Sequence, residues 1–95
     1  MKLTKKGSTY FDRLLDEGDP TITGEREYSY REAFDWVDQN EEMSMKQLPV
    51  ERRRWLTSNE FKVFSGEIEK DKLEDEIRCF ERALRELKER KMIVD

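Results

Sequence analysis

The chain contains no histidine among its 95 residues. Histidine is the commonest general base, the commonest metal ligand and the usual partner of a nucleophilic serine or cysteine. Cysteine occurs once, as Cys79, so no internal disulfide can form and no cysteine–histidine pair is available. The composition therefore predicts a protein that is not an enzyme and that has no catalytic, cofactor-binding or metal-binding residues.

Long apolar runs and clustered glycines are also missing. The four glycines stand apart from one another, so no glycine-rich phosphate loop is present. The longest uninterrupted apolar stretch is residues 92–94, whereas a membrane-spanning helix needs roughly 20 apolar residues. The lysines of residues 1–6 resemble the charged start of a signal peptide, but no apolar segment follows them. We expect a cytoplasmic protein that makes no membrane contact.

Charge is abundant and unevenly distributed. Charged residues make up 44% of the chain and the net charge is −4. Residues 12–42 hold eleven acidic and three basic residues, a net of −8, whereas residues 1–8 and 46–54 each carry a net of +3. This composition is close to that of disordered chains. Ten aromatic residues and a helical spacing of the apolar residues favour a folded protein with a small core.

The clearest structural signal lies near the carboxyl end. Apolar residues alternate spacings of four and three, which places them in one stripe on a helix (Leu73, Ile77, Phe80, Leu84 and Leu87). Acid-first i,i+4 pairs such as Glu74–Arg78 follow its outer face. We predict a mainly α fold: a single helical domain spanning residues 1–95, with three to five helices and a long amphipathic helix at about residues 67–91. The stripe can cover the domain's own helices or mediate a homodimer, so the chain is expected to be a monomer or a helix-mediated homodimer.

The earlier elements follow from capping residues and helix breakers. Ser8 and Thr9 predict the start of a first helix, and a capping box at residues 29–32 predicts the start of a second. Between them, residues 21–30 are compatible with a short β-hairpin. Pro49 suits the first position of a third helix that directs Trp55 and Leu56 inward, and a capping box at residues 57–60 predicts a fourth.

The acidic stretch is one candidate binding surface. It interleaves carboxylates with aromatic side chains, which together can supply charge and anchoring groups to a basic groove, as a mimic of nucleic acid would. A solvated face that keeps the protein soluble is the alternative. The predicted partner-binding residues are Asp12, Asp16, Glu17, Asp19, Glu25, Glu27, Tyr28, Tyr30, Asp35, Trp36, Asp38, Glu41 and Glu42.

A second candidate is the basic segment formed by Lys46, Arg52, Arg53 and Arg54. Arginine suits phosphate groups and acidic partners, but three successive arginines fan around most of a helix at about 100° per residue. Internal salt bridges to the surplus acids are the alternative. One turn of basic residues is also a small footprint for nucleic acid, since that affinity depends on many phosphate contacts.

These observations favour a protein-binding adaptor or inhibitor that presents an acidic surface to another protein, such as a nucleic-acid enzyme with a basic groove. Short acidic chains without a cofactor are common among proteins of phages and mobile elements. A DNA-binding regulator that uses the basic segment and a structural helical oligomer remain as alternatives, with nucleic acid the less favoured partner.

Overall fold

A computed structural model describes all 95 residues and confirms the mainly α fold. Five helices follow one another along the chain, and a short antiparallel pair of strands joins its two ends. The elements are β1 (Lys2–Leu3), α1 (Lys5–Glu17), α2 (Glu25–Gln39), α3 (Gln47–Leu56), α4 (Asn59–Ser65), α5 (Lys70–Glu89) and β2 (Ile93–Val94). In the sheet, Lys2 faces Val94 and Leu3 faces Ile93.

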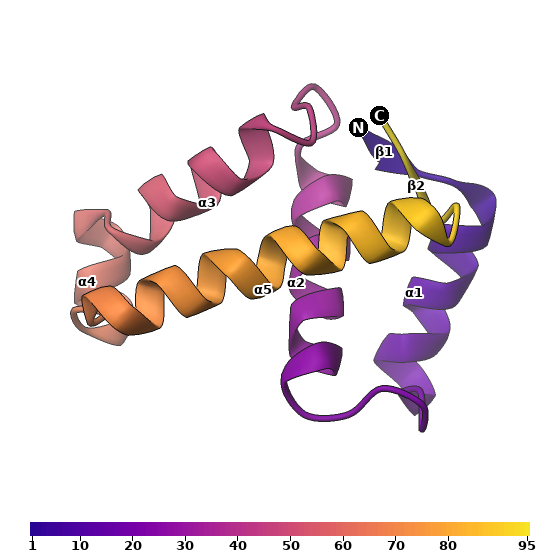
Figure 1. Cartoon of the computed structure of the whole chain (residues 1–95), viewed down its shortest axis with the longest axis horizontal. Coiled ribbons are helices and arrows are strands. Elements are labelled where there is room, and N and C mark those ends of the chain that lie inside the picture. Colours follow the sequence, from indigo (N-terminus) through magenta and orange to yellow (C-terminus); the bar gives the residue numbers. More distant parts are fainter.

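Helix α5 is the spine of the molecule. It runs across the full width of the structure, with α2 crossing it near the middle, α1 at one end and α4 at the other (Figure 1). All five residues of the predicted stripe are buried, together with Ala83. The stripe therefore covers the domain's own helices. The helix is slightly shorter than the predicted residues 67–91 because it begins at Lys70 and ends at Glu89.

The apolar interior has two unequal parts. The larger cluster contains 15 buried residues contributed mainly by α1, α2 and α5, among them Leu14, Phe34 and Phe80. The smaller cluster contains only Leu56, Leu73 and Ile77, with Phe61 and Ile68 packed against it. The end of the molecule that carries α4 therefore has a thin core.

Several predicted boundaries were wrong. The hairpin at residues 21–30 does not form, since Glu25 opens α2 four residues before the predicted capping box, and Ser29 is buried inside that helix. Helix α1 begins at Lys5, because the hydroxyl of Thr4 accepts a hydrogen bond from the Gly7 amide at 3.0 Å. Helix α3 begins at Gln47, two residues before Pro49. The Thr4 cap sets the start of α1, whereas α2 and α3 extend beyond the predicted starts without a side-chain cap.

The ion pairs on α5 also differ from those predicted. Glu74 is bound by Arg53 of α3, and Arg78 pairs with Asp75. Glu86 is bound by residues of α2. Partners on neighbouring helices thus replace the local i,i+4 partners along much of this face.

Candidate functional site

The candidate site begins with one buried charge on α3. Leu48, Arg52 and Leu56 follow one another at intervals of four residues, so they share a helix face, and all three are buried. Arg52 is only 3% exposed. Trp55, which we expected to point inward, is 39% exposed. Trp55 is exposed because Leu48 and Leu56 determine which face of α3 is buried, and Arg52, not Trp55, lies between them on that face.

Arg52 connects three helices. Its Nη1 donates to Glu32 Oε2 of α2 at 2.8 Å, and its Nη2 donates to Glu76 Oε2 of α5 at 3.2 Å. Its guanidinium carbon lies 4.9 Å from the ring centroid of Phe80 and 6.0 Å from that of Trp36. The Nε atom is buried and has no hydrogen-bond partner. Two carboxylates and two rings therefore hold a buried cation whose hydrogen-bonding capacity is not fully used.

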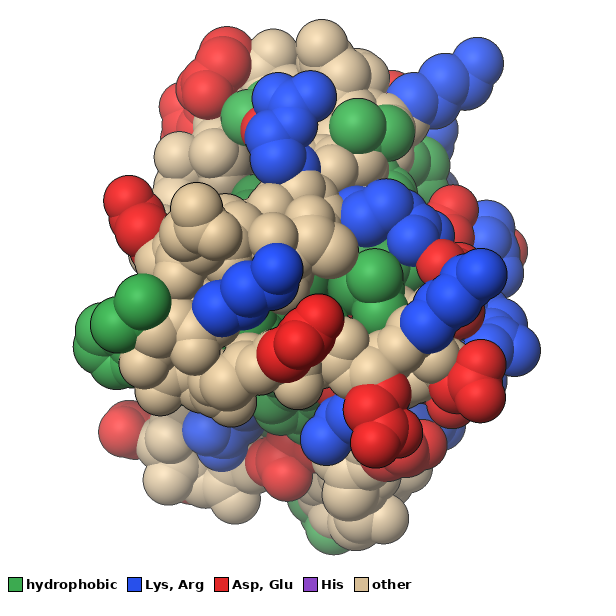
Figure 2. Space-filling view, turned by 90° about the vertical axis from the view of Figure 1, so that its left-hand side faces the viewer, with side chains coloured by type: hydrophobic (Ala, Val, Ile, Leu, Met, Phe, Trp, Pro, Cys, Tyr) green, Lys and Arg blue, Asp and Glu red, His purple; other side chains and the backbone are tan.

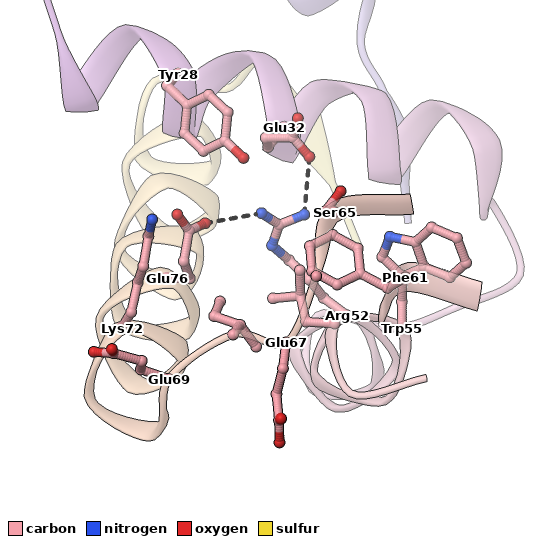
Figure 3. A pocket seen from close by; sticks show the side chains of 13 residues that line it. Tyr28, Glu32, Arg52, Trp55, Phe61, Ser65, Glu67, Glu69, Lys72 and Glu76 are labelled. Carbon is pink, nitrogen blue, oxygen red and sulfur yellow. Dashed lines mark hydrogen bonds and ion pairs between the residues drawn. The ribbon is translucent and has the colours of Figure 1, made fainter. Parts of the chain in front are cut away.

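Arg52 forms part of the wall of a pocket of about 680 Å³, which we call the α3–α4 pocket. Residues from α2, α3, α4, α5 and the α4–α5 connection line it. Glu32 and Glu76 point toward the Arg52 guanidinium, whereas Glu67 and Glu69 point away from it (Figure 3). The lining residues are Tyr28, Glu32, Arg52, Trp55, Leu56, Phe61, Ser65, Gly66, Glu67, Ile68, Glu69, Lys72 and Glu76. The pocket thus combines aromatic and aliphatic walls with charged groups.

The charge of the pocket is negative. Four glutamates and two basic residues line it, which gives a net charge of −2. The positive charge of Arg52 is paired with two of these glutamates, Glu32 and Glu76. The hydroxyl of Tyr28 points into this space (Figure 3). Burial, followed by the negative charges of Glu32 and Glu76, raises the pKa of Tyr28. A tyrosine in this setting stays protonated and can donate a hydrogen bond.

Beside the pocket, α4 leaves apolar side chains in solvent. None of its residues is buried, and Val63 and Phe64 are 88% and 90% exposed. Trp55 lines both the α3–α4 pocket and a second hollow of about 550 Å³ that includes Trp36. On the face at this end of the molecule, acidic and basic side chains are interspersed and apolar side chains lie between them (Figure 2). We call Trp55, Phe61, Val63 and Phe64 the apolar end.

Most of the predicted acidic residues are exposed and lack an ion pair. This group comprises Asp12, Asp16, Glu17, Glu25, Asp35, Asp38, Glu41 and Glu42. Glu27 pairs with Arg31, and Asp19 accepts hydrogen bonds from Tyr10 and Thr21. The acids are spread over α1, α2 and the two loops that flank α2, so the structure does not gather them into one pocket.

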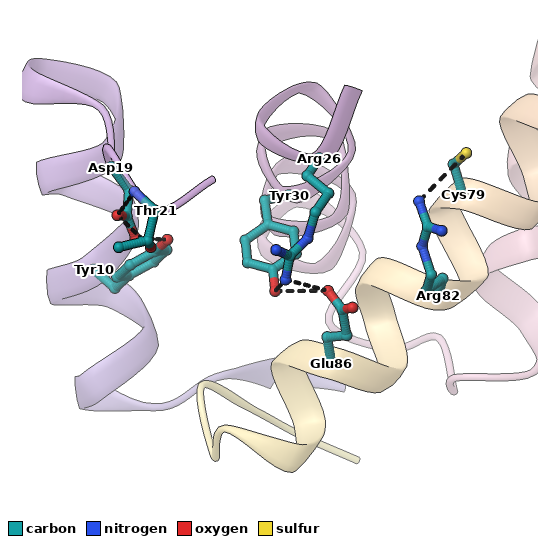
Figure 4. A network of polar contacts seen from close by, with 8 residues as sticks. All are labelled: Tyr10, Asp19, Thr21, Arg26, Tyr30, Cys79, Arg82 and Glu86. Atoms are coloured by element: carbon teal, nitrogen blue, oxygen red, sulfur yellow. Dashed lines mark hydrogen bonds and ion pairs between the residues drawn. The ribbon is translucent and has the colours of Figure 1, made fainter. Parts of the chain in front are cut away.

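The predicted aromatic anchors have three different positions. Tyr28 lines the α3–α4 pocket, and Trp36 is partly buried against Phe80 at a centroid separation of 6.2 Å. Tyr30 is only 1% exposed, and its hydroxyl donates to Glu86 Oε2 at 2.7 Å (Figure 4). Its expected place on a binding surface was therefore wrong, because its ring belongs to the core.

The predicted basic segment is largely engaged within the molecule. Arg52 is buried, Arg53 donates two hydrogen bonds to Glu74, and Arg54 pairs with Glu51 at 3.0 Å. Lys46 is exposed and unpaired. Internal salt bridges, the alternative left open by the sequence, are what the structure contains at all three arginines.

The sequence prediction missed the apolar end. A signal was available, since Phe61 and Val63 lie two positions apart in a seven-residue helix and so point in directions about 200° apart. A helix this short cannot bury both directions against one neighbour. At least one of its large apolar side chains had to remain in solvent.

Comparison with protein families, curated proteins and solved structures finds no match to this chain. None of the helices is both long and apolar enough to cross a membrane. No group of three or more acidic or cysteine side chains is placed to hold a metal ion. The function therefore has to be inferred from the shape, charge and exposure of the residues themselves.

Proposed function

We propose that the protein is a small protein-binding adaptor or inhibitor that docks on a partner through its apolar end, and that it acts in the cytoplasm. The observation that carries this proposal is the exposure of Phe64 and Val63 on a helix that buries no residue of its own. Large apolar side chains in water cost free energy, and contiguous exposed ones mark interaction surfaces. Aromatic side chains are also frequent among the residues that dominate binding energy.

The α3–α4 pocket supplies the second part of the docking surface. It lies beside the apolar end, shares Trp55 and Phe61 with it, and carries a net charge of −2. A partner segment with an apolar side chain and a lysine or arginine matches this combination. The apolar group would enter between the aromatic walls, and the cation would approach Glu67 or Glu69, which have no internal ion pair.

The unpaired acids on α1 and α2 favour a basic partner. Eight of the predicted acidic residues are exposed and free of internal salt bridges. Such charges accelerate association with a positively charged surface and make the rate fall with salt. An inhibitor that covers the basic groove of a nucleic-acid enzyme would use them in this way. No observation favours the alternative regulator built on Arg52, Arg53 and Arg54, or an oligomer built on α5.

The proposal is tested by quantitative capture from an extract of the cells that express the protein, with the wild type and two matched variants as bait. Phe64→Ser removes an exposed ring from the apolar end, whereas Leu15→Ser removes a half-exposed apolar side chain from α1. A true partner is recovered by the wild type and by Leu15→Ser and lost with Phe64→Ser. The partner is then purified and its affinity for all three baits is measured by calorimetry.

We expect Phe64→Ser to weaken that affinity at least tenfold and Leu15→Ser to change it less than twofold. Both variants should unfold at the wild-type denaturant concentration, because solvent-exposed substitutions usually change stability by less than about 0.5 kcal/mol. If no protein is recovered in a way that depends on Phe64, the proposed docking surface is wrong.

A further inference from the structure

A further concave surface lies between α1 and the end of α5. These elements lie at the opposite end of the molecule from α4 (Figure 1). It has a volume of about 500 Å³, and we call it the α1–α5 hollow. Its lining residues are Lys5, Lys6, Thr9, Tyr10, Arg13, Arg90 and Met92. Four of these seven are basic and none is acidic, in a chain whose acids outnumber its bases by 23 to 19.

Arg90 is held in place by aromatic rings rather than by a carboxylate. Its guanidinium carbon lies 5.0 Å from the ring centroid of Tyr10 and 5.9 Å from that of Tyr30. Both tyrosines are buried, and Tyr30 is fixed further by its hydrogen bond to Glu86 (Figure 4). Arg90 is partly buried and forms no salt bridge. Its position is therefore fixed, and no carboxylate oxygen lies within 4.0 Å of its guanidinium nitrogens.

The other three cations of the hollow are also unpaired. Arg13 lies with its guanidinium carbon 5.7 Å from the Tyr10 ring centroid, so two arginines share one ring. Lys5 and Lys6 belong to the first turn of α1, where the helix dipole adds positive potential. None of the three has a carboxylate within 4.0 Å.

Acidic side chains near Arg90 do not form an ion pair with it, although the charge of Asp19 acts on Arg90. Glu86 and Glu89 line a neighbouring hollow together with Arg90. Asp19 accepts a hydrogen bond from the Tyr10 hydroxyl at 2.7 Å and two more from Thr21 (Figure 4). The Asp19 carboxylate is therefore held at the hydroxyl group of Tyr10. Four cations line one concavity, and because like charges repel one another, an anion bound among them would be attracted by all four.

We infer that the α1–α5 hollow binds a phosphate-class anion. Four positive charges exceed what a single carboxylate would neutralise, and arginine guanidinium groups match the oxygens of a phosphate in paired hydrogen bonds. The hydroxyl of Thr9 adds a neutral donor to the lining. This inference is independent of the docking surface at the apolar end, because the two sites share no residue.

The inference is tested by titrating the ¹⁵N-labelled protein with inorganic pyrophosphate and following the backbone amide resonances. We expect saturable shifts centred on residues 5–13 and 90–92. The double variant Lys6→Gln/Arg13→Gln should bind at least tenfold more weakly, because it removes two exposed cations of the hollow and changes no buried residue. Lys62→Gln, which removes an exposed cation of α4, is the matched control and should bind as the wild type does.

A second arm distinguishes the source of the phosphate. A short DNA duplex that displaces pyrophosphate from the hollow identifies a nucleic-acid backbone as a ligand. Failure to displace it identifies a free phosphorylated molecule, and both outcomes support the phosphate class. Non-saturable shifts, equal weakening by Lys62→Gln, or equally tight binding of acetate would overturn the inference.

Discussion

The guanidinium carbon of Arg52 lies 4.9 Å from the ring centroid of Phe80, so a charged side chain of α3 rests on an aromatic ring of the α5 stripe. The two carboxylates that bind the same guanidinium come from α2 and α5. One side chain thus links three helices where the apolar core is thin. Arg52 and both carboxylates also line the α3–α4 pocket.

Removing the Arg52 charge should destabilise the fold. Arg52→Gln leaves Glu32 and Glu76 without their cation, and breaking a buried ion pair from one side costs about 3–5 kcal/mol. We expect a value near or below the lower end, about 2–3 kcal/mol, because both carboxylates are partly exposed to water. Arg53→Gln is the control, since its pair with Glu74 is exposed, screened by water and expected to contribute little. Urea denaturation measures both; equal losses would show that Arg52 is not the stronger link.

Substitution of Gly7 should destabilise the fold where the first turn of α1 packs against the end of the chain. An added Cβ at this position would lie 1.8 Å from the carbonyl oxygen of Met92, which accepts a hydrogen bond from the Thr4 amide. Gly7→Ala in an open helix would stabilise by up to about 1 kcal/mol. Here overpacking against backbone should reverse the sign and destabilise by about 1–3 kcal/mol. Ser8→Ala, at the next and exposed position, should not lower the melting temperature.

The hydrogen-bonded pair Tyr10–Asp19 predicts a loss of stability in acid. Hydrogen bonds from the Thr21 hydroxyl, the Tyr10 hydroxyl and the Thr21 amide lower the pKa of Asp19 from its usual value of 3.8 to about 2. A lowered folded-state pKa contributes stability above the unfolded-state pKa, and this contribution disappears as pH falls from about 4 through 2. The stability difference between wild type and Asp19→Asn should shrink over that interval. A difference that is constant with pH would contradict the assignment.

The same pair also predicts a loss of stability in alkali. Burial first, and then the hydrogen bond to Asp19, raises the pKa of Tyr10 from 10.0 to about 12. Between these values the unfolded chain releases the phenolic proton while the folded chain keeps it, so stability falls as pH rises. Tyr10→Phe cannot ionise and should lose less stability over the interval than the wild type does. Thermal unfolding scans at several alkaline pH values measure the slopes.

The cap of α4 should control the order of the apolar end. The hydroxyl of Ser58 accepts a hydrogen bond from the Phe61 amide at 3.2 Å, and such a cap contributes about 1 kcal/mol. Since α4 buries no residue, little else holds this helix. Ser58→Ala should speed hydrogen exchange of the α4 amides and weaken partner binding without changing the α5 amides. Thr57→Ala is the control, because the Thr57 hydroxyl donates to carbonyls of α3 and does not cap α4.

Local sequence signals were reliable where one signal dominated. The α5 stripe from Leu73 to Leu87 fixed a long amphipathic helix, since no other conformation places those side chains on one face. Residues 18–20 ended α1 at Glu17, as the glycine and proline there require. Local sequence signals were misleading at residues 21–30, where β-branched residues suggested a hairpin. In the structure the burial of Tyr30 against α5 holds residues 25–30 in helix α2, and residues 21–24 lie in the loop before it.

The candidate sites were less accessible to prediction. The i,i+4 spacing of Leu48, Arg52 and Leu56 could have placed Arg52 in the interior, but its two partners lie 20 and 24 residues away in the chain. The α1–α5 hollow joins Lys5 and Lys6 to Arg90, from opposite ends of the sequence. Neither of these long-range contacts produces a regular spacing of residues in the sequence.

The sequence by itself determined the helical class, the long C-terminal helix, the excess of acid and the lack of histidine chemistry, because these depend on composition and on spacings within one turn. Only the tertiary structure decided which charges were neutralised, which cations remained free and which apolar side chains stayed in water. Those outcomes depend on contacts between distant segments, and the energy of a charge or of an exposed ring is set by its neighbours in space.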